Sequence, residues 1–146
     1  MSIITQADIE GRIGESELIR LTDDAVAGTV DTTVVAAAIA DGEGEVLGRL
    51  AQAYTIPLDL ADTNTAAMVK TALLDVVLYR LMLRRPPVIE DYSNGYKNAI
   101  AWAEKIAAGS LGLPGESPVG EAPAGGGRIA IDASERIFSR ESFEGL

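Results

Sequence analysis

The chain has 146 residues, enough for one domain of ordinary size and little more. Hydrophobic residues make up 47% of it, so a buried core can form; aromatic residues make up only 5%, which favours closely spaced helices. The net charge of -10 argues against wrapping or groove reading of duplex DNA, because no basic stripe is present to neutralise phosphates.

The chain contains no cysteine and no histidine. Disulfides, thiolate nucleophiles, zinc fingers, imidazole bases and the usual serine triads are therefore excluded. The first ten residues, "MSIITQADIE", lack the basic region of a signal peptide. The longest apolar run, residues 66–83, contains Lys70, Asp75 and Arg80, so we expect a buried helix there and not a membrane span.

Two short helices are predicted near the N-terminus. Thr5 is placed to cap the first, "QADIEGRIG", with Asp8 in the position of a capping-box acid and Gly14 at the end. The second begins at Glu15 or Ser16 and spans a turn or two. Four residues supply the apolar contacts of this pair: Ile9, Ile13, Leu18 and Leu21. Residues 23–30 are predicted to form a loop.

A long helix is predicted from about Thr32 to Ala53, with Asp31 as its N-cap. Gly42 lies on its apolar stripe, which indicates close approach of another helix; a kink near "DGEGE" is the competing interpretation. Pro57 lies in the connector that follows. The stripe has spacings of three or four residues: Val35, Ile39, Gly42, Val46 and Leu50.

Two more helices complete the predicted domain. The one at about 65–85, capped by Asn64 or Thr63, is apolar over most of its circumference and should be the central helix. The last runs from about Glu90 to Ala108, with a weak point at Asn94-Gly95 and Gly109 at the C-terminal cap. One face of it carries Tyr92, Tyr96, Ala99, Trp102, Ala103 and Ile106.

The predicted fold class is all-α, with about four to five helices in a compact bundle over residues 1–108. Residues 109–127 contain seven glycines and three prolines and are predicted to be a linker. Residues 128–146 form the predicted C-terminal arm. Within the arm, "RIAIDA" alternates polar and apolar residues, which predicts a short β-strand with its pairing partner outside the helical domain.

No motif in the helical part indicates catalysis, a cofactor or a metal. "DGEGE", residues 41–45, fails the acid spacing of a calcium loop. Residues 93–95 have no histidine or cysteine nearby, and the adjacent Glu90 and Asp91 do not face each other on a helix. We therefore expect that the protein is not an enzyme.

Two clusters in the helical part have an ordinary and a functional interpretation. Tyr92, Tyr96 and Trp102 can stack on a ligand or base, but core packing is the favoured interpretation. The arginines at positions 80, 84 and 85 can contact phosphate, but a solvated face or an ion pair between subunits is favoured.

The residue pattern of the arm, residues 128–146, favours a partner-binding function. A tail with no partner is expected to be polar throughout, yet apolar and arginine side chains return after the glycines. Strand addition to a partner is one way to bury them, and folding back onto the chain's own helices is the alternative. The candidate partner-binding residues are Arg128, Ile129, Ile131, Arg136, Ile137, Phe138, Arg140, Phe143 and Leu146.

Four stretches of the chain resemble the Mu-type family of small phage head–tail adaptor (connector, neck) proteins. They are "ITQADIEGRIGESELIRLTDD", "VVAAAIADGEGEVLGRLAQAYTIPL", "YKNAIAWAEKIAAGSLGL" and "RIFSRESFEGL". They occur in the order that the family has, and together they cover most of the chain. The glycines of "DGEGEVLG" depart from the alanine-rich helix that the family pattern suggests.

This resemblance implies a structural protein of the virion neck, made in the host cytoplasm. It implies a ring, usually of twelve copies, that lies beneath the portal protein, lengthens the DNA channel and receives stopper or tail-completion proteins. DNA would pass through without sequence-specific binding, and no membrane is involved. Five arm residues would dock on the portal or on a neighbouring subunit: Ile129, Ile131, Phe138, Arg140 and Phe143.

A second interpretation, from a different functional class, is a small acidic regulatory or inhibitor protein that binds a host partner as a monomer. The sequence leaves open the ring size, the target of the arm and the residues that face the DNA.

Overall fold

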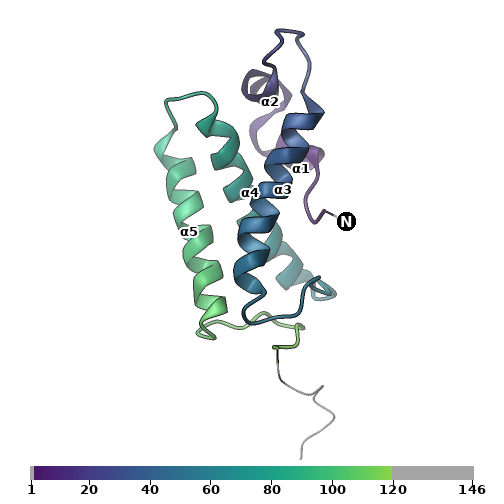
Figure 1. The fold of residues 1–146 in the computed structure, drawn as a ribbon, viewed down its shortest axis with the longest axis vertical. Helices are drawn as coiled ribbons and strands as arrows, with labels where there is room; N and C mark the ends of the chain where they lie inside the picture. Colours follow the sequence, from purple (N-terminus) through teal and green to yellow (C-terminus); the bar gives the residue numbers. More distant parts are fainter. Residues whose placement is uncertain (1, 120–146) are drawn as a thin grey trace, which may run out of the picture.

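A computed structural model of the chain describes residues 2–119, and this part is all-α (Figure 1). It contains five helices: α1 (Gln6–Ile13), α2 (Glu15–Thr22), α3 (Thr32–Leu50), α4 (Thr63–Leu83) and α5 (Glu90–Ala107). Within these residues there is no strand, only an isolated bridge between Tyr54 and Pro118. The all-α prediction is confirmed there. The strand predicted in residues 128–146 lies outside the described residues.

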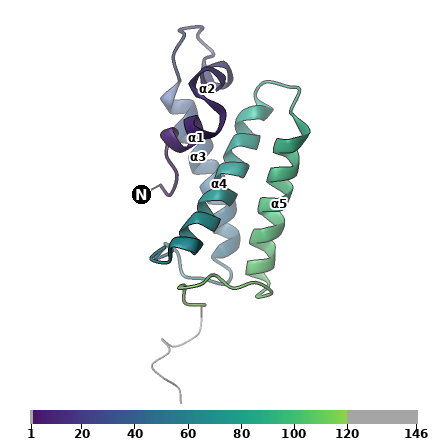
Figure 2. The ribbon, with the colours of Figure 1, turned by 180° about the vertical axis from the view of Figure 1, so that it is seen from behind.

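The three long helices form the body of the domain, and α1 and α2 pack beside α3 and α4 (Figures 1 and 2). The α2–α3 and α4–α5 connections lie at one end of this body. The α3–α4 connection and the segment after α5 lie at the other end, which we call the base.

The predicted capping box starts α1. The backbone N–H of Thr5 donates to Oδ2 of Asp8 at 2.9 Å, and the Thr5 hydroxyl donates to the same oxygen at 3.0 Å. Asp8 also lies 2.7 Å from Nζ of Lys70 on α4. The hydrogen bond from Lys70 is the main reason that the pKa of Asp8 is lowered. One carboxylate therefore orders the start of α1 and ties that helix to α4.

The apolar stripe predicted for α3 is its buried face. The buried residues of α3 are the five predicted: Val35, Ile39, Gly42, Val46 and Leu50. Asp31 caps the helix by accepting hydrogen bonds from the N–H groups of Thr33 and Val34. The helix ends at Leu50, three residues before the predicted end, because the chain tightens there into bonds from Gln52 to Arg49 and from Ala53 to Leu50.

Gly42 is where α3 and α4 approach most tightly. A Cβ atom at this position would lie 2.5 Å from Cγ2 of Val77, closer than two carbon atoms can pack. Gly44 and Gly48 have nothing within 4 Å of the same hypothetical atom. The close-approach interpretation of Gly42 is therefore confirmed, and α3 runs as one uninterrupted helix through "DGEGE".

The central helix is α4, as predicted, because it contacts each of the other four helices. Its N-cap is Asp62 and not Asn64 or Thr63, since the Asp62 carboxylate accepts the Thr65 N–H at 2.8 Å. The helix begins two residues before the predicted start and ends two before the predicted end. Its buried residues are Thr65, Val69, Ala72, Leu73, Leu74, Val76, Val77, Leu78, Leu81 and Met82.

The last helix, α5, passes through Asn94-Gly95 without a break, so the predicted weak point does not separate its first turn. Gly95 packs against Asp75 of α4, where a Cβ would be 3.6 Å from the carboxyl carbon. Ala99, Ala103 and Ile106 are buried. The three aromatic residues of this helix, Tyr92, Tyr96 and Trp102, are partly buried against the core. Core packing, the favoured interpretation, describes them in part.

We predict that Gly42→Ala destabilises the domain and that Gly44→Ala does not. The added methyl group at position 42 would force α3 away from Val77, which typically costs about 1–3 kcal/mol. At the exposed position 44, alanine removes the helix penalty of glycine, a gain of up to about 1 kcal/mol. Urea unfolding followed by circular dichroism measures both, and equal effects at the two positions would contradict the close approach.

Candidate functional site

The predicted partner-binding residues all lie in residues 128–146, outside the described part of the chain. What the structure describes is the point at which the chain leaves the helices to form the arm. That point is the segment 109–119, which crosses the base of the domain after α5 (Figure 2).

Three hydrogen bonds fasten this segment to the base. The N–H of the buried Leu113 donates to the hydroxyl of Tyr54 at 2.8 Å. The hydroxyl of Thr65, at the start of α4, donates to the carbonyl oxygen of Pro114 at 2.6 Å. The N–H of Val119 donates to the carbonyl oxygen of Ala53 at 2.7 Å.

Glu116 adds a fourth attachment. Its carboxylate accepts the N–H groups of Asp59 and Leu60 at 3.2 and 2.8 Å, in the α3–α4 connection. Residues 109–119, the first eleven of the predicted linker, are therefore attached to the helical domain at four points, although most of them are exposed. The sequence has no periodicity there because single side chains and backbone groups make the contacts. Residues 120–127, the rest of the predicted linker, lie outside the described part.

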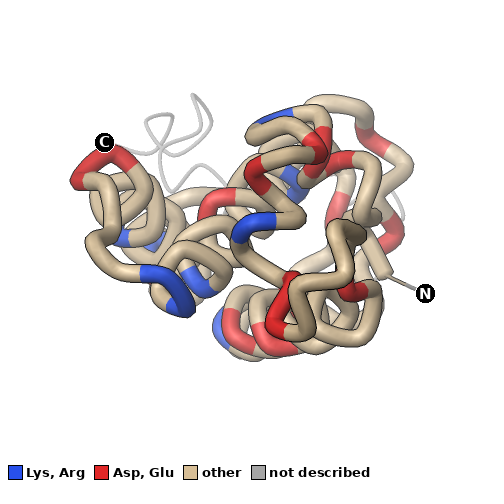
Figure 3. Tube along the Cα trace, turned by 90° about the horizontal axis from the view of Figure 1, so that it is seen from above, with Lys and Arg blue, Asp and Glu red and all other residues tan. Residues whose placement is uncertain are grey.

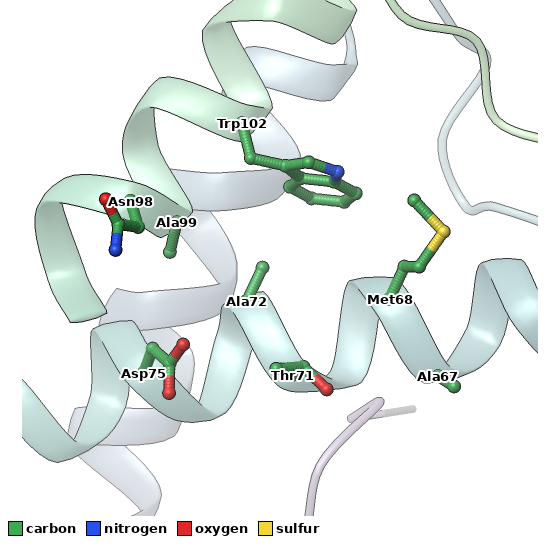
Figure 4. Close-up of a pocket in the computed structure, with 8 residues that line it drawn as sticks. All are labelled: Ala67, Met68, Thr71, Ala72, Asp75, Asn98, Ala99 and Trp102. Atoms are coloured by element: carbon green, nitrogen blue, oxygen red, sulfur yellow. The ribbon is translucent and has the colours of Figure 1, made fainter.

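A groove between α4 and α5 is the second candidate surface (Figure 4). Its volume is about 400 Å³. Met68 points from α4 towards the indole of Trp102 on α5, and Ala72 and Ala99 lie between the two helices beside them. Met68 is 36% exposed, so the apolar part of the groove is open to solvent. The lining residues are Ala67, Met68, Thr71, Ala72, Asp75, Asn98, Ala99 and Trp102.

Asp75 makes one end of the groove polar. Burial raises the pKa of its carboxyl group, and the nearby positive charge of Arg12 opposes this only in part. Nη1 of Arg12 lies 4.0 Å from Oδ1 of Asp75, the long limit of an ion pair. The carboxylate is thus partly desolvated and weakly neutralised, a combination that favours a further cationic partner.

This groove is not predicted from the sequence, in which Trp102 belongs to the apolar face of its helix and Met68 has no evident role. The signal that could have indicated it is the pair of small residues, Ala72 and Ala99, flanked by Met68 and Trp102 at helical spacing. That signal has meaning only once α4 and α5 are known to pack side by side.

Glu45 lies at the centre of a polar network that joins the three long helices. Nη2 of Arg80 is 2.6 Å from its Oε2, and the Tyr96 hydroxyl donates to its Oε1 at 2.8 Å. Arg49 lies 3.5 Å away, and the ring of Tyr96 stacks on Tyr79 at 4.5 Å between centroids. Burial opposes the charge on Glu45, yet the bonds from Arg80 and Tyr96 outweigh it, and the pKa is lowered.

The predicted arginine cluster is paired within the chain. Arg84 and Arg85 both contact the carboxylate of Asp24, which fastens the α2–α3 loop to the end of α4. Arg80 pairs with Glu45 and lies 4.0 Å from Asp41. Arg84 and Arg85 are also exposed, as the solvated-face interpretation predicts, and an ion pair between subunits stays a prediction.

Basic residues are few and mostly neutralised in the described part, and they are interspersed with acidic ones along the trace (Figure 3). Seven of the nine Lys and Arg side chains in residues 2–119 lie within 4.0 Å of a carboxylate. The described residues hold no group of three or more His, Cys, Asp or Glu side chains that could bind a metal ion.

Comparison with protein-family models matches residues 4–131 to the family described as Bacteriophage Mu, Gp36. The chain belongs to this family. The match covers all five helices and extends to residues 128–131 of the predicted arm. It confirms the predicted Mu-type phage family. No curated protein matches the chain. Among the helices of residues 2–119 in this Mu Gp36 family member, none is long and apolar enough to cross a membrane.

We predict that Tyr54→Phe loosens the base of this Mu Gp36 family member. The change leaves the buried N–H of Leu113 without its acceptor, which typically costs about 1–3 kcal/mol. Tyr92→Phe is the control, because its hydroxyl has no hydrogen-bond partner within residues 2–119 and we expect little change. Denaturant unfolding measures stability, and faster hydrogen exchange at Leu113 in the Tyr54 variant alone locates the effect.

We predict that Glu45→Gln lowers the free energy of unfolding at pH 7, with a loss that shrinks under acid conditions. The pKa of Glu45 in the folded state lies below its ordinary value of 4.5, so the charged carboxylate stabilises the fold at pH values above 4.5. This stabilisation disappears as the pH falls through the folded-state pKa. The exposed Glu104 on α5 provides the control, Glu104→Gln. We would measure the free energy of unfolding of each variant and of the unchanged protein from pH 7 to pH 3. A difference between Glu45→Gln and the unchanged protein that stays constant over this range would contradict the stabilising role of the network.

Proposed function

We propose that the protein is a structural head–tail connector of a tailed phage. In this role it forms a ring, expected to contain twelve copies, beneath the portal in the neck of the virion after synthesis in the host cytoplasm. The ring extends the DNA channel and links the capsid to stopper or tail-completion proteins. The observation that carries the proposal is the match to the Mu Gp36 family from residue 4 to residue 131.

The distribution of exposed apolar side chains supports a role between two partners. Val26, in the α2–α3 loop, is 90% exposed, and Ile89, in the α4–α5 connection, is 57% exposed. These loops lie at the same end of the domain (Figure 1). Ile56, Leu111 and Val119 are exposed at the base. A subunit stacked between a portal above and a tail protein below would use both ends.

The charge of the protein supports a channel through which DNA slides. The net charge is -10, and few cations of the helical domain are free of a carboxylate neighbour. Phosphate binding depends on such cations. An acidic channel wall would therefore repel the DNA backbone and would not hold it in one register.

The arm supplies the proposed attachment to the portal or to a neighbouring subunit. Its candidate anchors are the aromatic and arginine side chains Phe138, Arg140 and Phe143, residue types that dominate many interfaces. A ring presents one arm per subunit, so modest single contacts add to a strong attachment. The role needs no catalysis and no cofactor, and we propose that the protein has neither.

We predict that deletion of residues 128–146 leaves the helical domain folded and abolishes attachment to portal-containing heads. Circular dichroism checks the fold, and co-sedimentation with purified heads measures attachment. Phe138→Ala and Phe143→Ala in the full chain should each weaken attachment by about tenfold or more, as expected of interface anchors. Lys97→Ala, on the exposed side of α5, is the control and should attach normally.

Normal attachment of the truncated chain would overturn the role of the arm. Failure of the full chain to bind heads, together with light scattering that shows a monomer with and without portal, would favour the acidic regulatory protein that binds a host partner.

A further inference from the structure

We infer that, in the free chain, residues 136–140 of the arm occupy the groove between α4 and α5 of the same molecule. Phe138 lies between Met68 and Trp102, and the guanidinium of Arg140 lies at Asp75. This inference concerns the subunit before assembly and does not rest on the connector role. The arm would fill the groove in the free subunit and would leave it when a partner binds the arm.

The groove has an unpartnered apolar face in residues 2–119. Apart from Leu83 at its C-terminal end, α4 has one exposed large apolar residue, Met68. Trp102 of α5 points towards it across the groove (Figure 4). Small residues at the floor, Ala72 and Ala99, leave room for a ring the size of phenylalanine. Two phenylalanines are present in the whole chain, and both are in the arm.

The chain leaves the domain close to this groove. Pro114 is bonded to Thr65, so the exit segment passes the first turn of α4. Met68 lies one helical turn further along α4, about 5 Å up the axis from Thr65, and Asp75 about 15 Å. The nineteen steps from Val119 to Phe138 span about 25 Å as a coil and about 60 Å at full extension, which covers both distances.

The order of charges along the arm matches the order along the groove. An arm that enters from the base meets Met68 and Trp102 first and Asp75 further up α4. Phe138 precedes Arg140 by two residues, so the apolar anchor meets the apolar end and the arginine meets the carboxylate. Asp75 lacks a close cation of its own, because Arg12 lies at 4.0 Å.

Because the arm is covalently tethered to the domain that carries the groove, binding to its own groove is favoured over binding to the groove of a second copy. A short tether holds its end at an effective concentration in the millimolar range. A separate copy reaches that level only at protein concentrations far above those of ordinary solution experiments. The docked arm also covers Met68 and Trp102 until a portal or another subunit competes for Phe138.

The test is disulfide trapping in the full chain, which has no cysteine of its own. Thr71→Cys places a thiol in the groove, and Ser139→Cys places one beside Phe138 without changing the anchors. The control pairs Gln52→Cys with Ser139→Cys, because the exposed Gln52 neighbours Ala53, to which Val119 is bonded. We expect oxidation to a crosslinked monomer about tenfold faster for the Thr71 pair, at a rate independent of protein concentration.

Adding Phe138→Ala should slow the Thr71 pair to the rate of the control. Equal rates for the two pairs would overturn the inference, because proximity to the tether alone would then explain the crosslink. Disulfide-linked dimers whose rate rises with concentration would overturn it in favour of a second copy. These experiments contain no portal, so their failure leaves the connector proposal intact.

Trp102 gives an independent measurement, since it is the single tryptophan of the chain. Phe138→Ala in the otherwise unchanged protein should increase quenching of its fluorescence by acrylamide, because the groove opens. Phe143→Ala, outside residues 136–140, is the matched control and should leave quenching unchanged. Unchanged quenching in both variants would contradict the inference.

Discussion

The structure depends on the central helix α4, which buries ten of its 21 residues. Because α4 contacts all four other helices, its neighbours are positioned by how closely they approach it. Gly42 permits the tightest approach, against Val77, and Asp8 holds α1 to Lys70 of the same helix. The paired helix α5 leaves a groove because alanines, at positions 72 and 99, face each other where larger side chains would have closed it.

The helices were predictable because each rests on a local signal. Asp31 and the Thr5–Asp8 box mark two starts, and the stripe from Val35 to Leu50 names the buried face of α3. The N-cap of α4 was misplaced because Asp62 is one of several capping residues in "ADTNT", and only geometry selects among them. The docking of residues 109–119 could not be predicted because its bonds pair a backbone group, which every sequence has, with one side chain from a distant part of the chain.

Of the two candidate surfaces, the arm could be predicted from local sequence and the groove could not. Phe138 and Arg140 could be singled out from sequence because apolar residues beyond a glycine-rich stretch are conspicuous. The groove could not, since Met68 and Trp102 are distant in sequence and become neighbours only when α4 and α5 pair. The match to the Mu Gp36 family, residues 4–131, includes the groove and the first four residues of the predicted arm.

The attachment of residues 109–119 has a mechanical consequence. Tension applied to the chain beyond Val119 would first load the hydrogen bond from the Val119 N–H to the Ala53 carbonyl oxygen. The bonds from Leu113 to Tyr54 and from Thr65 to Pro114 share the load next. Force is thus delivered to the ends of the two most deeply packed helices, and α5 is shielded from being peeled away from its C-terminal end.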